Sequence, residues 1–180
     1  MKYYKDTNNQ IYAFEDSVTQ DIINNVAKKH NTEFTQITEI QFKSFKLFGV
    51  FDKTEEEIKQ KEEENKLDQI KQAKINYIKQ TRTDLVNKII ITLNNGKELN
   101  GDEDSQDRIN RAINGLPDDT TTINWIDYNN ETIELTKPEL KEALQKAGQA
   151  QTEIFVKYNE LRKQVNEATT IEEVEAIVWE

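Results

Sequence analysis

TKPELKEALQKAGQAQTEIFVKYNELRKQVNEA, residues 136–168, is the longest periodic stretch of the sequence. Thr136 and Glu139 have the spacing of a helix capping box, and Pro138 falls in the first turn, where a helix does not need the N–H that proline lacks. Apolar side chains then recur with a 4-3-4-3 spacing over about four heptads. The stretch therefore predicts one long helix with a single seam. The seam consists of Leu140, Leu144, Ala147, Gln151, Ile154, Tyr158, Leu161, Val165 and Ala168.

Two packings satisfy this seam equally well. It can form a coiled coil between copies of the chain, or it can pack along residues 67–86 as an antiparallel helical hairpin. Those residues carry a helical face that includes Leu67, Ile70, Ile78 and Leu85. Gln151 is the polar member of the seam, and a polar residue there can fix register or oligomeric state. In the hairpin, its expected partners are Lys74, Asn76 or Thr81.

Short strands precede the long helix. Residues 88–93 are rich in β-branched side chains and end at Asn94-Asn95-Gly96, a strong hairpin signal, with a return strand over residues 97–100. A helix is expected over residues 102–113, followed by a second hairpin with strands 122–126 and 132–135. Trp125, in that hairpin, is expected to anchor the core. Thr170 and Glu173 predict a final short helix.

The first fifty residues predict a small ββαα-like module. Residues 2–14 read as an aromatic hairpin around the turn Asp6-Thr7-Asn8-Asn9. Ser17 and Gln20 suggest a capping box for a helix over residues 21–29, and Thr38 and Gln41 suggest another. The second helix carries Phe42, Phe45 and Phe48, with Gly49 as its stop.

A charged segment separates the two ends of the chain. Thr54 and Glu57 predict a further helix start, and up to Lys66 the only clear apolar residue is Ile58. A helix that is polar on all sides has no face to bury, which favours a solvated spacer. We therefore expect an α+β fold with a module at 1–50, a helical spacer at 51–66 and a C-terminal domain at 67–180.

Composition narrows the function classes. The 180 residues carry 24 basic and 34 acidic side chains, a net charge of −10, which disfavours nucleic acid as a partner. There is no cysteine and one histidine, so disulfides, thiolate chemistry and multi-histidine metal sites are excluded. No stretch approaches the roughly 20 apolar residues of a membrane span, and the N-terminus lacks a signal-like apolar segment, so we expect synthesis in a cytoplasm.

The candidates for catalysis and metal binding are weak. His30 lies in a polar helix end without an obvious nucleophile beside it. Asp102 and Asp104 suggest a metal site for a hydrolase, but acidic residues at a helix start are explained by the helix dipole. Asp127 and its neighbours form an oxygen-rich turn that needs no ligand. We expect no cofactor.

The aromatic residues of the first hairpin have two interpretations. Tyr3, Tyr4, Tyr12 and Phe14 can form a recognition patch for a partner, because tyrosine supplies contact area at low entropic cost. The favoured alternative is that the inward-facing members pack on Phe42, Phe45 and Phe48, since side chains alternate along a strand.

Several stretches together resemble known phage proteins. MKYYKD (1–6), NQIYAFED (9–16) and ITEIQF (37–42) resemble the small N-terminal module of phage and prophage tail-fibre and tail-fibre-assembly proteins. The C-terminal part resembles an uncharacterised domain found in the same setting. Its matching stretches are SQDRI (105–109), TINW (122–125), DYNN (127–130), IELT (133–136) and ATTIEEV (168–174). In that pattern Asp-Asn usually follows the tryptophan, whereas this chain has Asp127-Tyr128-Asn129-Asn130.

The resemblance implies a non-enzymatic binding or assembly protein, such as a chaperone or accessory, whose partner is a tail-fibre or other tail protein. It carries no catalytic residues over. It places the protein in the cytoplasm of a bacterial host during assembly, or in the virion tail. The alternatives are a structural coiled-coil segment of a fibre, with a homo-oligomer built through the long helix, and, more remotely, a metal-assisted hydrolase.

Overall fold

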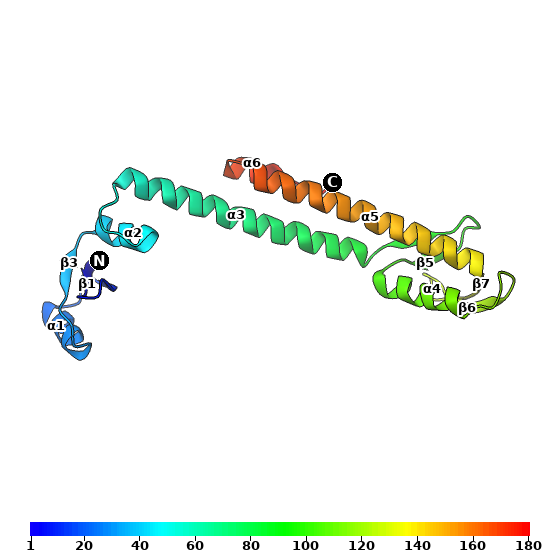
Figure 1. The fold of residues 1–180 in the computed structure, drawn as a ribbon, viewed down its shortest axis with the longest axis horizontal. Helices are drawn as coiled ribbons and strands as arrows, with labels where there is room; N and C mark the ends of the chain where they lie inside the picture. The colour runs from blue at the N-terminus through cyan, green and yellow to red at the C-terminus, as the bar shows by residue number, and fades with distance from the viewer. The chain divides into compact units, whose positions relative to one another are not determined.

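The computed structural model describes residues 1–180 as an α+β fold with six helices and seven short strands (Figure 1). The chain forms two compact units, Met1–Asp68 and Gln69–Glu180. Helix α3 (Glu55–Val86) continues across the division as one helix. None of the helices is both long enough and apolar enough to cross a membrane.

The segment expected to be a separate solvated spacer is the beginning of α3. Its capping box is present: Glu57 N–H donates to Thr54 Oγ1, and Thr54 N–H donates to the Glu57 carboxylate. No glycine or proline interrupts residues 55–86, so the helix continues to Val86. The segment is not wholly solvated either, because Ile58 is only 4% exposed.

The first unit contains a three-stranded sheet, one strand of which was not predicted from the sequence. The predicted hairpin is confirmed, with β1 (Lys2–Lys5) antiparallel to β2 (Ile11–Phe14). On its other edge β1 pairs with β3 (Thr35–Ile37), which gives the order β2-β1-β3. This strand has three residues, of which one, Ile37, is apolar, too short for a visible alternation. The module is therefore ββαβα.

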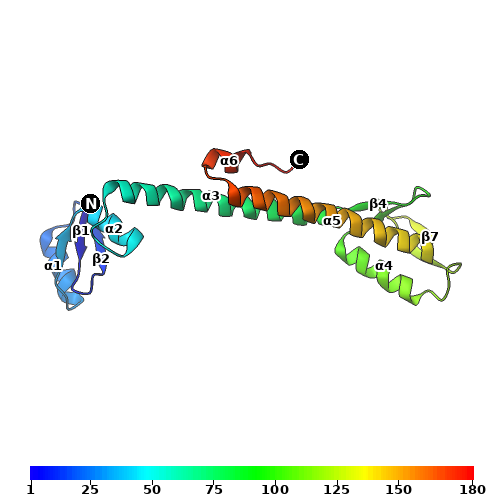
Figure 2. The same ribbon diagram turned by 45° about the horizontal axis from the view of Figure 1, so that its top comes forward.

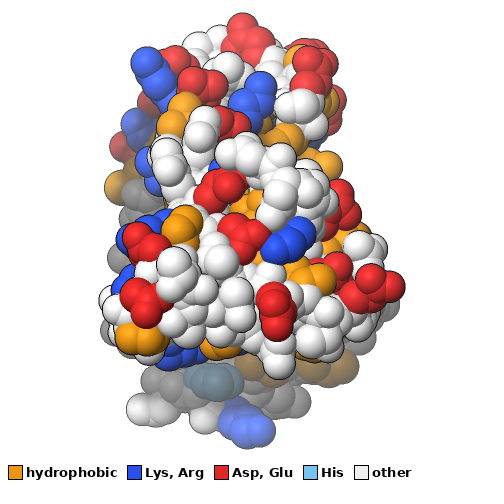
Figure 3. Space-filling view, turned by 90° about the vertical axis from the view of Figure 1, so that its right-hand side faces the viewer, with side chains coloured by type: hydrophobic (Ala, Val, Ile, Leu, Met, Phe, Trp, Pro, Cys, Tyr) orange, Lys and Arg blue, Asp and Glu red, His pale blue; other side chains and the backbone are white.

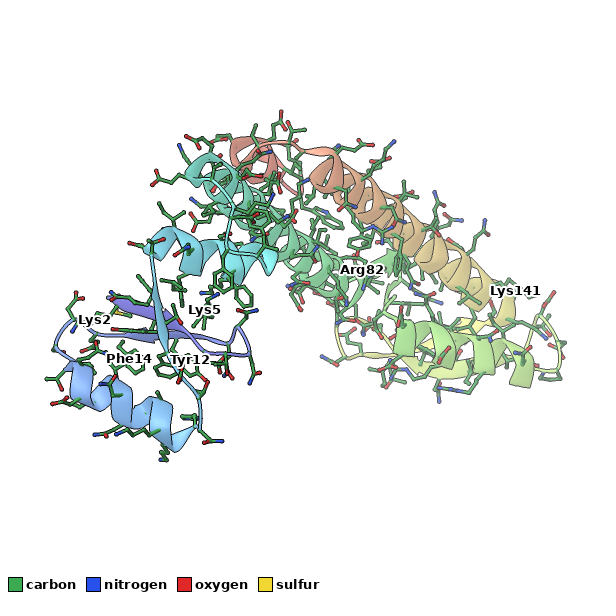
Figure 4. All side chains as sticks on the ribbon, turned by 60° about the vertical axis from the view of Figure 1, so that its left-hand side comes forward. Lys2, Lys5, Tyr12, Phe14, Arg82 and Lys141 are labelled. Carbon is green, nitrogen blue, oxygen red and sulfur yellow. The ribbon has the colours of Figure 1, made fainter.

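Two helices cover the two faces of this sheet (Figure 4). In α2 (Glu39–Phe48), the capping box of Thr38 and Gln41 is confirmed, and Gly49 ends the helix with a φ of 75°. In α1 (Gln20–Lys29), the predicted Ser17 box is wrong, because Thr19 is the N-cap and its side chain accepts no capping bond. The Gln20 side chain instead accepts a hydrogen bond from the Tyr4 hydroxyl.

The strands and the shorter helix of the second unit match the sequence prediction closely. β4 (Ile90–Thr92) pairs with β5 (Glu98–Asn100), and β6 (Thr122–Ile126) pairs with β7 (Thr132–Thr136). α4 (Glu103–Gly115) lies between the two hairpins in sequence. Together with α5 (Lys137–Glu167) these elements enclose one core. Its fully buried members include Leu99, Ile109, Leu135, Leu140, Ala143 and Ala147.

Most of the α5 seam is buried within the chain, whereas Leu144, Gln151 and Ile154 are half-buried. Its first part joins the core just described, and its later members Tyr158, Leu161 and Val165 are also buried. In Figures 1 and 2 this part of α5 runs antiparallel beside the C-terminal half of α3. Val86 of α3 is buried, whereas the predicted Leu85 is 36% exposed. Val86 is buried in place of Leu85 because Val86, the last residue of α3, is the one that packs into the core of the hairpins.

Polar contacts fasten α3 to α5 and to the segment that follows it. The Arg82 guanidinium lies over the rings of Phe155 and Tyr158, 4.9 and 4.8 Å from their centroids. Lys71 Nζ donates to the Asn166 carbonyl. Lys74 Nζ donates to the carbonyls of Glu175 and Ile177, at the end of α6 (Ile171–Ala176). These contacts hold the C-terminal helix beside α3.

Gln151 makes different contacts from those expected. Its Nε2 donates to Glu103 Oε1 at 2.8 Å, and its Oε1 accepts from Gln106 Nε2 at 2.9 Å. Both partners belong to α4, so the expectation of a partner on α3 is wrong. At this point in α5 the seam faces α4, and the rings that Arg82 of α3 contacts, Phe155 and Tyr158, lie one and two turns further along the helix.

The start of α5 is joined to the first hairpin of this unit through Glu139. The predicted capping box is present, with the Thr136 N–H and hydroxyl donating to Glu139 Oε2. The other carboxylate oxygen accepts from Lys97 Nζ at 2.7 Å and from Asn95 Nδ2 at 2.6 Å. Burial alone would raise the pKa of Glu139, but these hydrogen bonds outweigh burial and lower the pKa to about 2.

Two glycines give a matched test of packing in the second unit. A Cβ at Gly101 would lie 2.6 Å from Ile89 Cγ2 and 2.8 Å from Ile91 Cγ1, whereas one at Gly148 meets nothing within 4 Å. We expect Gly101→Ala to lower the free energy of unfolding by about 1–3 kcal/mol through overpacking. Gly148→Ala, within α5, should raise it by up to about 1 kcal/mol through helix propensity. Urea unfolding measures both, and equal effects would contradict this packing.

The Glu139 contacts predict how stability depends on pH. Because the folded pKa of about 2 lies below the ordinary value of 4.5, these bonds stabilise the fold above pH 4.5, and their contribution is lost as the pH falls towards 2. Glu139→Gln should therefore lower the melting temperature at pH 7, with a smaller difference from the parent at pH 3. Glu160→Gln, at an exposed position of α5, is the control. A pH-independent difference would contradict this role.

Candidate partner-binding site

A pocket of about 320 Å³ lies in the second unit, where β5, the first turns of α4 and β6 with its turn come together. Its volume is at the lower end of the range of about 300–1,000 Å³ that is usual for ligand sites. Most of the lining is hydrogen-bonding side chains, with one aromatic ring among them. The lining residues are Asn100, Ser105, Arg108, Asn124, Trp125, Ile126, Asp127 and Asn130.

The α4 side of the pocket is a chain of hydrogen bonds. Asp102 caps the helix by accepting from the Ser105 N–H, and its second oxygen accepts from Ser105 Oγ at 2.7 Å. Ser105 Oγ in turn accepts from an Arg108 guanidinium nitrogen at 2.8 Å. Burial would raise the pKa of Asp102, but the bonds from Ser105 and the nearby Arg108 charge lower it overall. This series of hydrogen bonds holds one nitrogen of the Arg108 guanidinium in place at the pocket.

The opposite side is the turn between β6 and β7. Asp127 is 8% exposed, and its Oδ1 accepts from the backbone N–H groups of Asn129 and Glu131. This is the turn chemistry expected from the sequence. The Tyr128 N–H donates to the Glu98 carbonyl at 2.9 Å and so ties the turn to β5.

Trp125 belongs to both the core and the pocket. The side chain is half-buried and packs against the core cluster, as expected for an anchor, and it also lines the cavity. The sequence predicted only the core role, and the pocket adds a second one. A tryptophan is large enough to pack one part of its ring system inward and present another part outward.

The aromatic residues proposed as a recognition patch in the first unit are not brought together. Tyr4, Tyr12 and Phe14 face α1 and surround Phe34, with the Tyr12 and Phe34 centroids 4.5 Å apart. Tyr3 points to the other face and stacks on Phe42. Tyr4 is only 4% exposed, and the other three are half-buried. Figure 4 shows Tyr12 and Phe14 between the sheet and α1. Alternation along the strands divides the four residues between two covered faces.

The remaining candidates are placed apart from one another. His30 ends α1 with its ring 6.3 Å from that of Tyr12. Asp102 is occupied as a helix cap, and the chain contains no group of three or more His, Cys, Asp or Glu side chains arranged to hold a metal ion.

A protein-family model named "Domain of unknown function (DUF4376)" matches residues 69–178. The chain belongs to the DUF4376 family. The matched residues cover nearly all of the second unit, including the pocket and the α5 seam. No curated protein and no solved structure matches the chain.

The pocket side chains could not be grouped from the sequence alone. Residues 105–109, 122–125 and 127–130 were noted separately, as parts of a resemblance. Ser105, Arg108, Asn124, Trp125, Asp127 and Asn130, which come from these stretches, line one cavity. Asn100 lies outside these stretches, at the end of a three-residue strand, and nothing in the sequence connects it with the β6 side of the pocket.

The surface around this end of the DUF4376 domain has a mixed character. In Figure 3 acidic and basic side chains are interspersed, and hydrophobic side chains show only as small separate patches. Ile126 and Tyr128 are among the exposed apolar residues, at 56% and 44%. A partner on this face therefore meets mostly polar groups, and the pocket supplies the concave feature.

Ser105→Ala tests the hydrogen-bond chain. Ser105 is 1% exposed, so loss of its hydroxyl leaves Asp102 Oδ2 without this donor and releases Arg108. We expect the free energy of unfolding to fall by about 1–3 kcal/mol in urea titrations. Ser17→Ala, at an exposed position, should have little effect. Equal stability of the two variants would contradict a stabilising role for the Asp102–Ser105–Arg108 hydrogen bonds.

Proposed function

We propose that this DUF4376 protein is a non-enzymatic binding or assembly protein of a phage tail, with a tail-fibre or other tail protein as its partner. The observation that carries the proposal is that three stretches, each resembling part of an uncharacterised domain found alongside phage tail-fibre modules, line a single pocket. Residues that lie apart in the sequence and meet at one concave surface fit a role in recognition.

The chemistry of the pocket favours binding over catalysis. The Ser105 hydroxyl donates to Asp102 and accepts from Arg108, so it is committed to the structure of the α4 start. The asparagines present neutral donors and acceptors, and Arg108 presents a fixed charge. Such groups recognise a ligand by hydrogen bonding.

The coiled-coil alternative has less support. A fibre segment assembled through the heptad seam needs that seam free, and here most of its residues are buried against other elements of the same chain. We therefore favour an accessory or chaperone that acts in the host cytoplasm during assembly, or remains on the tail.

Co-expression with the tail-fibre protein of the same phage or prophage tests the function. We expect the chain to co-elute with that protein in size-exclusion chromatography and to increase the yield of soluble fibre. Asn124→Arg, which places a long charged side chain at the pocket, should reduce both effects. Asn110→Arg, at an exposed position of α4 outside the pocket, is the matched control. No co-elution and an unchanged yield would contradict the proposal.

A further inference from the structure

The pocket lies between two strand edges that belong to different sheets. β5 pairs only with β4, and β6 pairs only with β7. The pocket is lined by three consecutive residues of β6, Asn124, Trp125 and Ile126, whose side chains alternate between the two faces. A cavity in contact with both faces of a strand lies along its edge.

The hydrogen-bond register shows which backbone groups point to this edge of β6. Asp127 N–H donates to the Glu131 carbonyl, so residue 127 directs its polar groups towards β7. In an antiparallel pair this direction alternates. Asn124 and Ile126 therefore direct their N–H and C=O groups away from β7. Tyr128, two residues after Ile126, also points away from β7, and its N–H donates to the Glu98 carbonyl of β5.

The same reasoning applies to β5. The Leu93 N–H donates to the Lys97 carbonyl, and the Gly101 N–H donates to the Ile89 carbonyl, so residues 97 and 101 direct their groups towards β4. Glu98 and Asn100 then point the other way, and Glu98 meets Tyr128. Beyond that bond the two strands do not pair. The backbone groups of Asn100 on one strand and of Asn124 and Ile126 on the other face the pocket.

Two side chains at the pocket can bond an extended chain that carries a carboxylate: Arg108 as a cationic donor and Asp127 as an acceptor. Arg108 is held by Ser105 through one nitrogen and forms no ion pair with an acidic side chain. Asp127 is more than nine-tenths buried, and its Oδ2 has no hydrogen-bond partner in the chain. Arg108 thus offers donors to a carboxylate, and Asp127 offers an acceptor to a peptide N–H.

We infer that the pocket binds a short, extended, acidic peptide segment, which adds as a strand between β5 and β6. The peptide backbone pairs with Asn100, Asn124 and Ile126, and a side-chain or C-terminal carboxylate pairs with Arg108. This mode of recognition obtains affinity from main-chain hydrogen bonds and specificity from neighbouring side chains. The inference deepens the proposed function, in which the segment belongs to the tail partner, but the recognition chemistry can be tested without that partner.

A random library of eight-residue peptides with free carboxyl termini is the probe, selected on the full chain. We expect the bound peptides to be enriched in Asp, Glu or an essential free carboxyl terminus. Arg108→Gln should weaken their binding about tenfold or more, as for loss of a charged hydrogen bond, while Arg111→Gln, on the exposed side of α4, should not. N-methylation at alternate peptide residues should weaken binding by a similar factor, and methylation at the intervening residues should not.

The possible outcomes separate the two proposals. Absence of acidic enrichment, equal binding by the two arginine variants, or insensitivity to N-methylation overturns strand addition at this pocket. If selected peptides behave as expected but the tail-fibre protein neither binds nor competes with them, the recognition chemistry stands and the proposed function fails. If the tail-fibre protein binds but neither competes with the peptides nor responds to Arg108→Gln, the function stands and this site is not its interface.

Discussion

The second unit depends on the burial of one face of α5 by elements of the same chain. Leu140, Ala143 and Ala147 are fully buried in the core, and Tyr158, Leu161 and Val165 continue the buried face. The small alanines let neighbouring elements approach the helix closely. Most of the stability of a helix in a protein comes from packing of its apolar face, so this tertiary contact is what holds α5 in place. The same contact commits the heptad seam to the interior of one chain.

That arrangement also positions the pocket. The Glu139 carboxylate joins the start of α5 to the β4–β5 hairpin, and Gln151 joins the middle of the helix to α4. β5 and α4, two walls of the pocket, are thus both attached to α5. The third wall, β6 and its turn, reaches β5 through Tyr128. The two hairpins meet at that bond and leave their facing edges open beyond it, where an added strand has backbone partners on both sides.

Much of the local structure followed from the sequence because its causes are local. The capping boxes at Thr38, Thr54, Thr136 and Thr170 each involve side chains three residues apart, and all four are present. The Asn-Gly hairpin is likewise fixed by its own turn, with Gly96 at a φ of 86°. The Ser17 box failed because a contact distant in sequence, from Tyr4 to Gln20, engaged its second member.

Features that depend on distant contacts could not be predicted in the same way. The strand Thr35–Ile37 exists because β1 offers it an edge, and Gln151 meets α4 because of where α5 crosses it. The heptad pattern identified the seam but not the elements that pack on it, since a second copy of the chain and a helix of the same chain satisfy the same spacing. The pocket required the relative placement of three segments, β5, α4 and β6 with its turn, although most of its residues fall in stretches that the sequence had singled out.

Backbone amide hydrogen exchange of the full chain, measured with and without the tail-fibre protein, tests the central claim that a partner strand adds at the open edges of β5 and β6. The amides of Asn100, Asn124 and Ile126 should exchange quickly in the free chain and slow markedly in the complex, because they gain hydrogen-bond acceptors. Unchanged exchange at these three amides in a complex that does form, with slowing confined to the sheet of the first unit, would contradict the account.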